Sequence, residues 1–96
     1  MHTQGEVEYR WDPAKAAANF RNHGIRFSDA VLSLEDPLAR SIPDPDAIGE
    51  DRFICLGADP SGRVLVTVFA PRCRTVRMLS SRKASRAERC AYESGA

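Results

Sequence analysis

The stretch that decides the fold is residues 53–81, FICLGADPSGRVLVTVFAPRCRTVRMLSS. It holds three runs rich in β-branched and apolar residues, at positions 53–58, 64–70 and 75–81, and each run has the length of a strand. The first two runs are joined by Asp59-Pro60-Ser61-Gly62, with proline and glycine where a type I turn favours them. Short connections join antiparallel neighbours, so the stretch predicts an antiparallel meander whose central strand is residues 64–70.

A short strand and two helices are predicted upstream of the meander. Residues 6–11 alternate polar and apolar side chains, which predicts a short edge strand. Asp12-Pro13 begins a first helix with a capping carboxylate and a proline at the first helical position, and Gly24 is the expected left-handed stop. A second, shorter helix is expected over residues 27–36, with Ser28 as its cap.

A third helix is predicted near the C-terminus. Ser85 and Glu88 form a capping box, which opens a helix to about Ser94 with little apolar surface, so we expect it to dock weakly or to need a partner. The order of elements predicts an α+β fold: a small antiparallel β-sheet with two N-terminal helices and one C-terminal helix. A chain of 96 residues is the size of one domain, 1–96.

Composition excludes several classes of protein. Hydrophobic residues make up 43% and charged residues 28%, which is incompatible with a wholly disordered chain. The longest apolar run, residues 64–70, is too short to span a bilayer, and the first six residues do not form a signal peptide. The three cysteines, Cys55, Cys73 and Cys90, are too few and too widely spaced for a disulfide framework or a zinc site. We therefore expect a cytoplasmic location, no metal and no cofactor.

Charge is distributed unevenly along the chain. Residues 1–60 hold six Lys/Arg against eleven Asp/Glu, whereas residues 61–96 hold eight against two. The basic C-terminal part predicts a polyanionic partner, either nucleic acid or an acidic protein surface. A stand-alone DNA-binding domain is the weaker interpretation, because the only basic helix also carries Glu88 and Glu93.

Several short motifs follow one another in a specific order and spacing. They are WDPAK at residues 11–15, DPD at 44–46, GEDRF at 49–53 and RMLSSRKA at 77–84, with further matches between them. Over residues 8–93 the chain thereby resembles the BrnT family, ribonuclease toxins of bacterial type II toxin–antitoxin systems. The resemblance implies a RelE-like fold and an endoribonuclease that arrests translation and growth.

The resemblance also implies a partner. A BrnA-like antitoxin with a ribbon-helix-helix domain would neutralise the toxin in a heterotetramer, which would contact operator DNA only through the antitoxin. Two positions depart from the family pattern: Ala47, where histidine is frequent, and Ala70-Pro71-Arg72, where Thr-Glu-Arg is frequent. The alternative is therefore a non-catalytic or degenerate toxin-fold module that acts only as the partner of a DNA-binding antitoxin.

Metal-independent RNA cleavage needs a base for the 2′-OH, an acid for the 5′-oxygen and cations for the phosphorane. The residues predicted to supply these groups are His23, Glu50, Arg77, Arg82, Lys83 and Tyr92. Further RNA contacts are predicted at Arg63, Arg72, Arg74 and Arg86.

Each catalytic candidate also has a structural interpretation. Residue alternation along the strand predicts Arg77 and Lys83 on one face and Arg82 on the other. The cations can equally form a solvated basic edge or meet an acidic antitoxin segment. His23 can interact with the end of its helix, Glu50 can belong to a solvated acidic loop, and Tyr92 can simply dock the last helix.

Overall fold

The computed structural model describes residues 2–4 and 7–95. Within these residues the chain forms, in order, β1 (His2–Gln4), β2 (Val7–Arg10), α1 (Pro13–His23), α2 (Phe27–Leu34), β3 (Arg40–Pro43), β4 (Phe53–Ala58), β5 (Val64–Arg72), β6 (Thr75–Lys83) and α3 (Arg86–Ser94). The predicted α+β class, with two helices before the meander and one after it, is confirmed. None of the helices in the described residues has both the length and the apolar character needed to cross a membrane.

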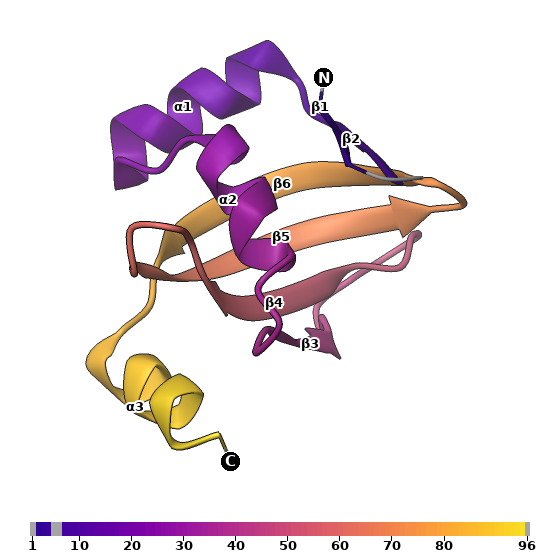
Figure 1. The fold of residues 1–96 in the computed structure, drawn as a ribbon. Helices are drawn as coiled ribbons and strands as arrows, with labels where there is room; N and C mark the ends of the chain where they lie inside the picture. Colours follow the sequence, from indigo (N-terminus) through magenta and orange to yellow (C-terminus); the bar gives the residue numbers. More distant parts are fainter. Residues whose placement is uncertain (1, 5–6, 96) are drawn as a thin grey trace.

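The strands form one sheet in the order β1-β2-β6-β5-β4-β3. The strands from β3 to β6 pair with their sequence neighbours in antiparallel fashion, and for β4, β5 and β6 this confirms the predicted meander. β2 instead pairs in parallel with β6, so the sheet is mixed and the all-antiparallel prediction is wrong. The reason is topological: the two helices intervene between β2 and the meander, and the meander ends with a strand running beside β2 in the same direction (Figure 1).

β2 is also not an edge strand, because β1 covers its outer side. Residues 2–4 were not predicted as a strand, since His-Thr-Gln carries no apolar alternation. The Asp12 and Gly24 signals of α1 are confirmed: the Asp12 carboxylate accepts from the Ala14 N–H, and Gly24 adopts φ 71°. The Ser28 cap is wrong: the cap position is Arg26, two residues earlier, and Phe27, the first residue of α2, is buried against Trp11.

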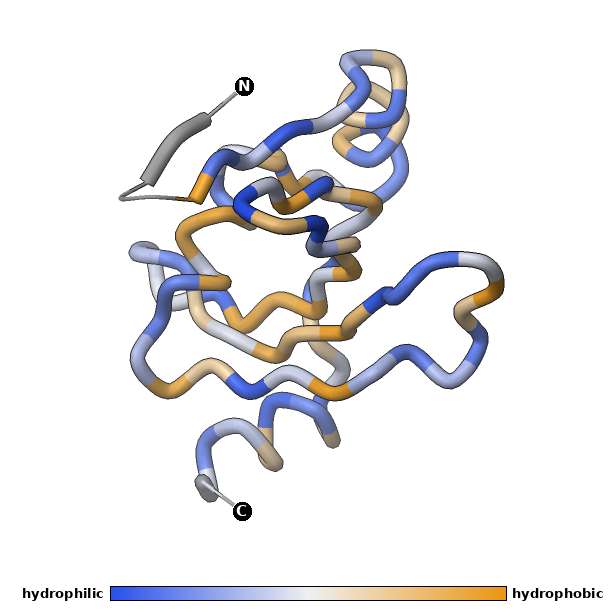
Figure 2. Tube along the Cα trace, turned by 90° about the vertical axis from the view of Figure 1, so that its right-hand side faces the viewer, coloured by the Kyte–Doolittle hydropathy of each residue, from blue (hydrophilic) through white to orange (hydrophobic). Residues whose placement is uncertain are grey.

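The core lies between α1, α2 and one face of the sheet (Figure 1). Leu65 and Met78 on the sheet pack with Ile25, Phe27 and Val31 from the helical side, and all five are at most 2% exposed. Hydrophobic residues follow the strands, whereas α3 near the C-terminus is mostly hydrophilic (Figure 2). No residue of α3 is buried.

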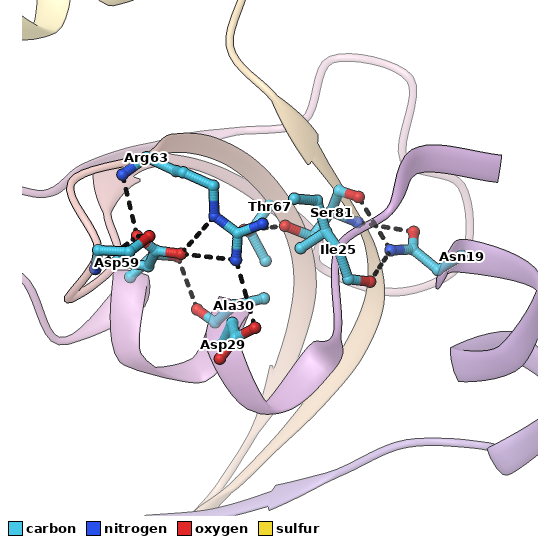
Figure 3. Close-up of polar contacts among 10 residues, drawn as sticks. Asn19, Ile25, Asp29, Ala30, Asp59, Arg63, Thr67 and Ser81 are labelled. Atoms are coloured by element: carbon cyan, nitrogen blue, oxygen red, sulfur yellow. Dashed lines mark hydrogen bonds and ion pairs between the residues drawn. The ribbon is translucent and has the colours of Figure 1, made fainter. Parts of the chain in front are cut away.

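Buried hydrogen bonds fix α1 against β6 (Figure 3). The Asn19 side chain donates to the carbonyls of Ile25 and Ser81, at 3.0 and 2.9 Å, and accepts from the Ser81 N–H at 2.9 Å. The Ser81 hydroxyl also lies 2.9 Å from the hydroxyl of Thr67 on β5. These bonds satisfy buried polar groups that would otherwise oppose folding.

The opposite face of the sheet, which we call the open face, carries Arg10, Ile42, Ile54, Val68 and Arg77. Two observations place them there. Neighbours in sequence point to opposite faces of a sheet, and several of these residues adjoin one that packs against the helices; the others are Cα partners, on the adjacent strand, of a residue already placed on the open face. Ile42 is 60% exposed, so part of this face is uncovered apolar surface. α3 lies at its far end, where Arg40 on β3 donates to the Ala91 carbonyl at 2.7 Å.

A β-bulge in β6 changes which side chains share a face. The register shifts between Val68 and Phe69, which pair with Ser80 and Met78, so Leu79 is an extra residue. As a result Arg77 and Arg82 both point to the open face, and the prediction that they point to opposite faces is wrong. Lys83 instead pairs with Leu65, whose side chain lies on the helix-covered face.

Candidate active site

An arginine-lined pocket of about 760 Å³ lies on the open face at the beginning of β6. Its walls come from β2, the β3–β4 loop and the β5–β6 hairpin, three segments that are distant in sequence. We call Arg10, Arg52, Arg72 and Arg77 the arginine cluster: three of them line this pocket, and Arg52 lines the hollow beside it. Glu50 borders both spaces.

The Glu50 carboxylate is bound by the cluster. Arg77 Nη2 donates to both of its oxygens, at 2.7 Å to Oε1 and 2.5 Å to Oε2, and Arg52 Nε lies 3.7 Å from Oε2. The hydrogen bond from Arg77, helped by the charges of two further arginines, holds the pKa of the Glu50 carboxyl below its ordinary value. Glu50 is therefore ionised at neutral pH.

Positive charge exceeds negative charge at this carboxylate. Arg52 Nε is buried and has no hydrogen-bond partner among the described residues. Arg72 acts on Glu50 only through its charge, without a hydrogen bond to it. The rest of the Arg52 side chain is accessible, at 39% exposure, and guanidinium groups gathered at an open pocket are suited to an oxyanion such as a phosphate.

The structure brings together some of the residues predicted from sequence. Glu50, Arg72 and Arg77 line the pocket, and Arg74 is exposed in the two-residue turn of the adjoining β5–β6 hairpin. Cys73 in the same turn has a left-handed φ of 57°.

Other predicted residues lie at the opposite end of the sheet. Arg82 lies five positions after Arg77 on β6, but Leu79 is an extra residue, so their partners Val66 and Ala70 are four positions apart on β5, about 13 Å at the usual rise of a strand. His23 and Arg82 border a groove of about 320 Å³ with an apolar floor that includes Ile54 and Val68. The arginine-lined pocket and this groove are thus two separate spaces, and none of the described residues lines both.

The remaining candidates have structural partners. Both terminal nitrogens of Arg82 donate to Glu88, at 2.8 and 3.0 Å, and Tyr92 donates through its hydroxyl to Asp36. These bonds attach α3 to β6 and to the α2–β3 connection. The predicted capping box is confirmed at the start of this helix, and Arg86 is its first residue.

Arg63 lies outside both the arginine-lined pocket and the groove beside Arg82. Its guanidinium binds the buried carboxylate of Asp59 at 2.8 Å and reaches Asp29 on α2 at 3.3 Å (Figure 3). This arrangement ties the β4–β5 turn to α2. Lys83 borders a separate hollow next to Arg63.

Sequence reasoning missed Arg10 and Arg52. Arg52 directly follows Glu50 and Asp51, so the sequence placed it near the candidate carboxylate but did not show the direction of its side chain. Arg10 gave no signal because its approach to Arg77 depends on the parallel pairing of β2 with β6. Among residues 2–4 and 7–95, no group of three or more His, Cys, Asp or Glu side chains is arranged to hold a metal ion.

Both departures from the family pattern lie at this site. Ala70 and Pro71 line the arginine-lined pocket, and Ala47 lines the adjoining hollow under the β3–β4 loop. The positions where the chain differs from the family pattern thus lie in the walls of these two hollows.

Two comparisons with known proteins identify the class of protein to which this chain belongs. The fold matches the crystal structure of the Brucella abortus ribonuclease toxin, BrnT, with a TM-score of 0.68 at 24% sequence identity, covering 83% of this chain and 99% of that one. The sequence model for the BrnT ribonuclease toxins of type II toxin–antitoxin systems matches residues 11–88. The chain therefore belongs to the BrnT family of ribonuclease toxins, a class defined by an RNA substrate and an antitoxin partner. A search of curated protein sequences gave no match.

Proposed function

We propose that the chain is an endoribonuclease that cleaves RNA at the arginine cluster without a metal ion, and thereby arrests translation and growth. The observation that carries this proposal is the ionised Glu50 carboxylate held among guanidinium groups. The arrangement combines a proton acceptor with a site for a phosphate, the two elements that cleavage by the neighbouring 2′-OH requires.

The reaction needs no group outside RNA, water and this pocket. Glu50 accepts the proton of the 2′-OH, whose oxygen attacks the adjacent phosphorus. The bond from phosphorus to the 5′-oxygen breaks, and that oxygen takes a proton from water. The products are a 2′,3′-cyclic phosphate and a free 5′-hydroxyl. Arg77 and Arg52 stabilise the negative charge that accumulates on the phosphorane oxygens.

Substrate binding prepares Glu50 for this role. In the free protein the Glu50 carboxylate accepts a hydrogen bond from Arg77, so its pKa is low and it is a weak base. A phosphate that takes over the Arg77 guanidinium removes this hydrogen bond. The pKa of Glu50 then rises, and the carboxylate becomes a better proton acceptor when the 2′-OH is nearby.

The candidates at the far end of the sheet receive other roles in this proposal. Arg82 and Tyr92 hold α3 in position through Glu88 and Asp36. His23 and Lys83 lie outside the arginine-lined pocket and remain available for contacts with a longer RNA or with the antitoxin.

We further propose that a BrnA-like ribbon-helix-helix antitoxin neutralises the chain in the cytoplasm. The two would form a heterotetramer that represses its own operon, with DNA contacts made by the antitoxin. Support comes from the family membership and from the open face, where exposed cationic and apolar surface lie side by side.

A second candidate function is a degenerate toxin that only binds its antitoxin. The observation that favours it is the occurrence of Ala47, Ala70 and Pro71 at the site, where the family pattern has polar side chains. The two candidates differ in whether the purified chain cleaves RNA.

The test uses a fluorescent RNA oligonucleotide and its fully 2′-deoxy counterpart. We expect cleavage of the RNA alone, products with 2′,3′-cyclic phosphate ends, and no inhibition by EDTA. Glu50→Gln should lower the rate by about 10²-fold or more. Asp46→Asn, an exposed carboxylate of the same loop, is the matched control and should keep the wild-type rate. Full inhibition by EDTA, or an active Glu50→Gln variant, would refute the mechanism.

A further inference from the structure

The strand register aligns three arginines across the sheet. Arg10 on β2 is the Cα partner of Arg77 on β6, and Arg77 is the partner of Ala70 on β5. Arg52 directly precedes Phe53, the partner of Phe69, so it continues the same line on the far side of Ala70. The line runs at right angles to the strands. Arginines lie on both sides of Ala70, whose small side chain forms the floor between them.

The length of this line suits a nucleic acid backbone. Neighbouring strands are about 4.8 Å apart, so the distance from the backbone of Arg10 to that of Arg52 is about 14 Å. Two successive phosphodiesters of an RNA strand fit along it. The arginine side chains at its middle and outer end are accessible: Arg77 is 49% and Arg10 is 59% exposed.

Placing two arginines directly opposite each other opposes folding, because like charges on facing positions repel. Each is neutralised by its own carboxylate: Arg10 pairs with Glu8 at 2.6 Å, and Arg77 pairs with Glu50. Glu8 and Glu50 thus lie against the arginines in the way that the phosphates of a bound RNA strand would. The arrangement of Arg10 repeats that of Arg77, the cation proposed to bind the scissile phosphate.

We propose that Arg10 binds the phosphate next to the scissile one, so that the RNA strand crosses the sheet from Arg52 towards Arg10. This inference rests on the proposed function. The scissile phosphate lies over Ala70, between Arg77 and Arg52, where Glu50 can reach the 2′-OH. Glu8 is displaced from Arg10 when RNA binds.

The competing path would follow β6 from Arg77 to Arg82. Along that path the middle of the groove is largely apolar, with Ile54 and Val68, and its polar side chains are fewer than those around the arginine cluster: His23, Ser80 and Ser81, with Arg82 and Glu88 bound to each other. Arg82 is also held by two hydrogen bonds to Glu88, which in turn accepts from the Ser85 N–H of its capping box. Among residues 2–4 and 7–95, Arg10 is held by Glu8 alone, two residues away on its own strand, and is easier to recruit.

The experiment measures binding of a single-stranded 2′-O-methyl RNA octamer, which lacks the hydroxyl that the reaction consumes. Affinity is recorded against salt concentration for the wild type and for variants. Each phosphate contact contributes about 0.7 to the slope of log K against log salt, so Arg10→Gln should reduce the slope by about that amount. Arg10→Lys should retain it, and Arg21→Gln, an exposed cation on α1, is the matched control. Glu8→Gln should strengthen binding severalfold, because the phosphate no longer competes with a carboxylate.

A wild-type slope in Arg10→Gln would overturn the proposal, and so would a slope that falls in Arg82→Gln instead. These outcomes differ from failure of the proposed function, which is seen as absence of cleavage of ordinary RNA by the wild type. A chain that binds the octamer through Arg10 but cleaves nothing would keep the subsite and lose the ribonuclease. A wild type with no affinity for the octamer would refute both.

Discussion

Replacing Asn19 with alanine tests how α1 is held on the sheet. The Asn19 side chain makes three hydrogen bonds to backbone groups of Ile25 and Ser81, and the residue is 6% exposed. Alanine would leave two carbonyls and one N–H without partners in a buried position. Each orphaned group costs about 1–3 kcal/mol, and local relaxation recovers part of this, so we expect the free energy of unfolding to fall by about 3–5 kcal/mol.

The loss is measured by urea denaturation followed by circular dichroism. For a domain of this size the same change lowers the melting temperature by about 15–30 °C. Asn22→Ala, an exposed asparagine on the same helix, is the matched control, and should change stability by less than about 0.5 kcal/mol. Its alanine removes no buried partner and slightly favours the helix.

A loss below about 1 kcal/mol for Asn19→Ala would refute this reasoning, because the buried groups would then have found other partners. The variant also separates structure from catalysis. At a temperature where both proteins are folded, Asn19→Ala should cleave RNA at the wild-type rate. A folded variant that has lost activity would show that the asparagine takes part in the site.

Two further predictions concern pH. Because Arg77 lowers the pKa of Glu50, kcat/KM for RNA should be flat from about pH 8 to pH 5 and fall only in more acidic solution. A base with the ordinary pKa of imidazole, about 6.5, would instead give an inflection near neutral pH. An inflection of that kind that disappears in His23→Ala would contradict the Glu50 assignment. The Arg82 guanidinium lowers the pKa of Glu88 to about 2, so this carboxylate stabilises the fold above its unfolded pKa of about 4.3 and ceases to do so as pH falls towards 2. The melting temperature of the wild type should therefore fall more steeply with acidification over this range than that of Glu88→Gln, and parallel curves would show that the ion pair contributes nothing.

Local signals in the sequence predicted the elements that depend on neighbouring residues. The Asp12 cap, the Gly24 stop and the Ser85–Glu88 capping box are all contacts within a few positions, and all are confirmed. The Ser28 cap was wrong because burial of Phe27 overrides the preference of the serine for the cap position. Tertiary packing, which the local pattern does not contain, decided that helix start.

The site was harder to predict than the fold because it depends on register. Glu50, Arg72 and Arg77 were identified as candidates, but alternation along β6 could not reveal the bulge at Leu79, which reverses the faces of the residues after it. Arg10 could not be found at all without the parallel pairing of β2 with β6. Long-range pairing thus decides which of the many arginines share a pocket.

The same register bears on whether the departures from the family pattern abolish activity. Ala70 lies between Arg77 and the position of Arg52, so a small side chain there leaves the floor of the cluster free for a phosphate. The groups that the proposed chemistry needs, a carboxylate and guanidinium donors, come from other strands and from the β3–β4 loop, and they are present. Restoring threonine at position 70 would add a methyl and a hydroxyl to this floor. If phosphate occupies it, Ala70→Thr should weaken binding of RNA rather than increase the rate of cleavage, whereas a gain in rate would identify the departure as a loss of catalytic function.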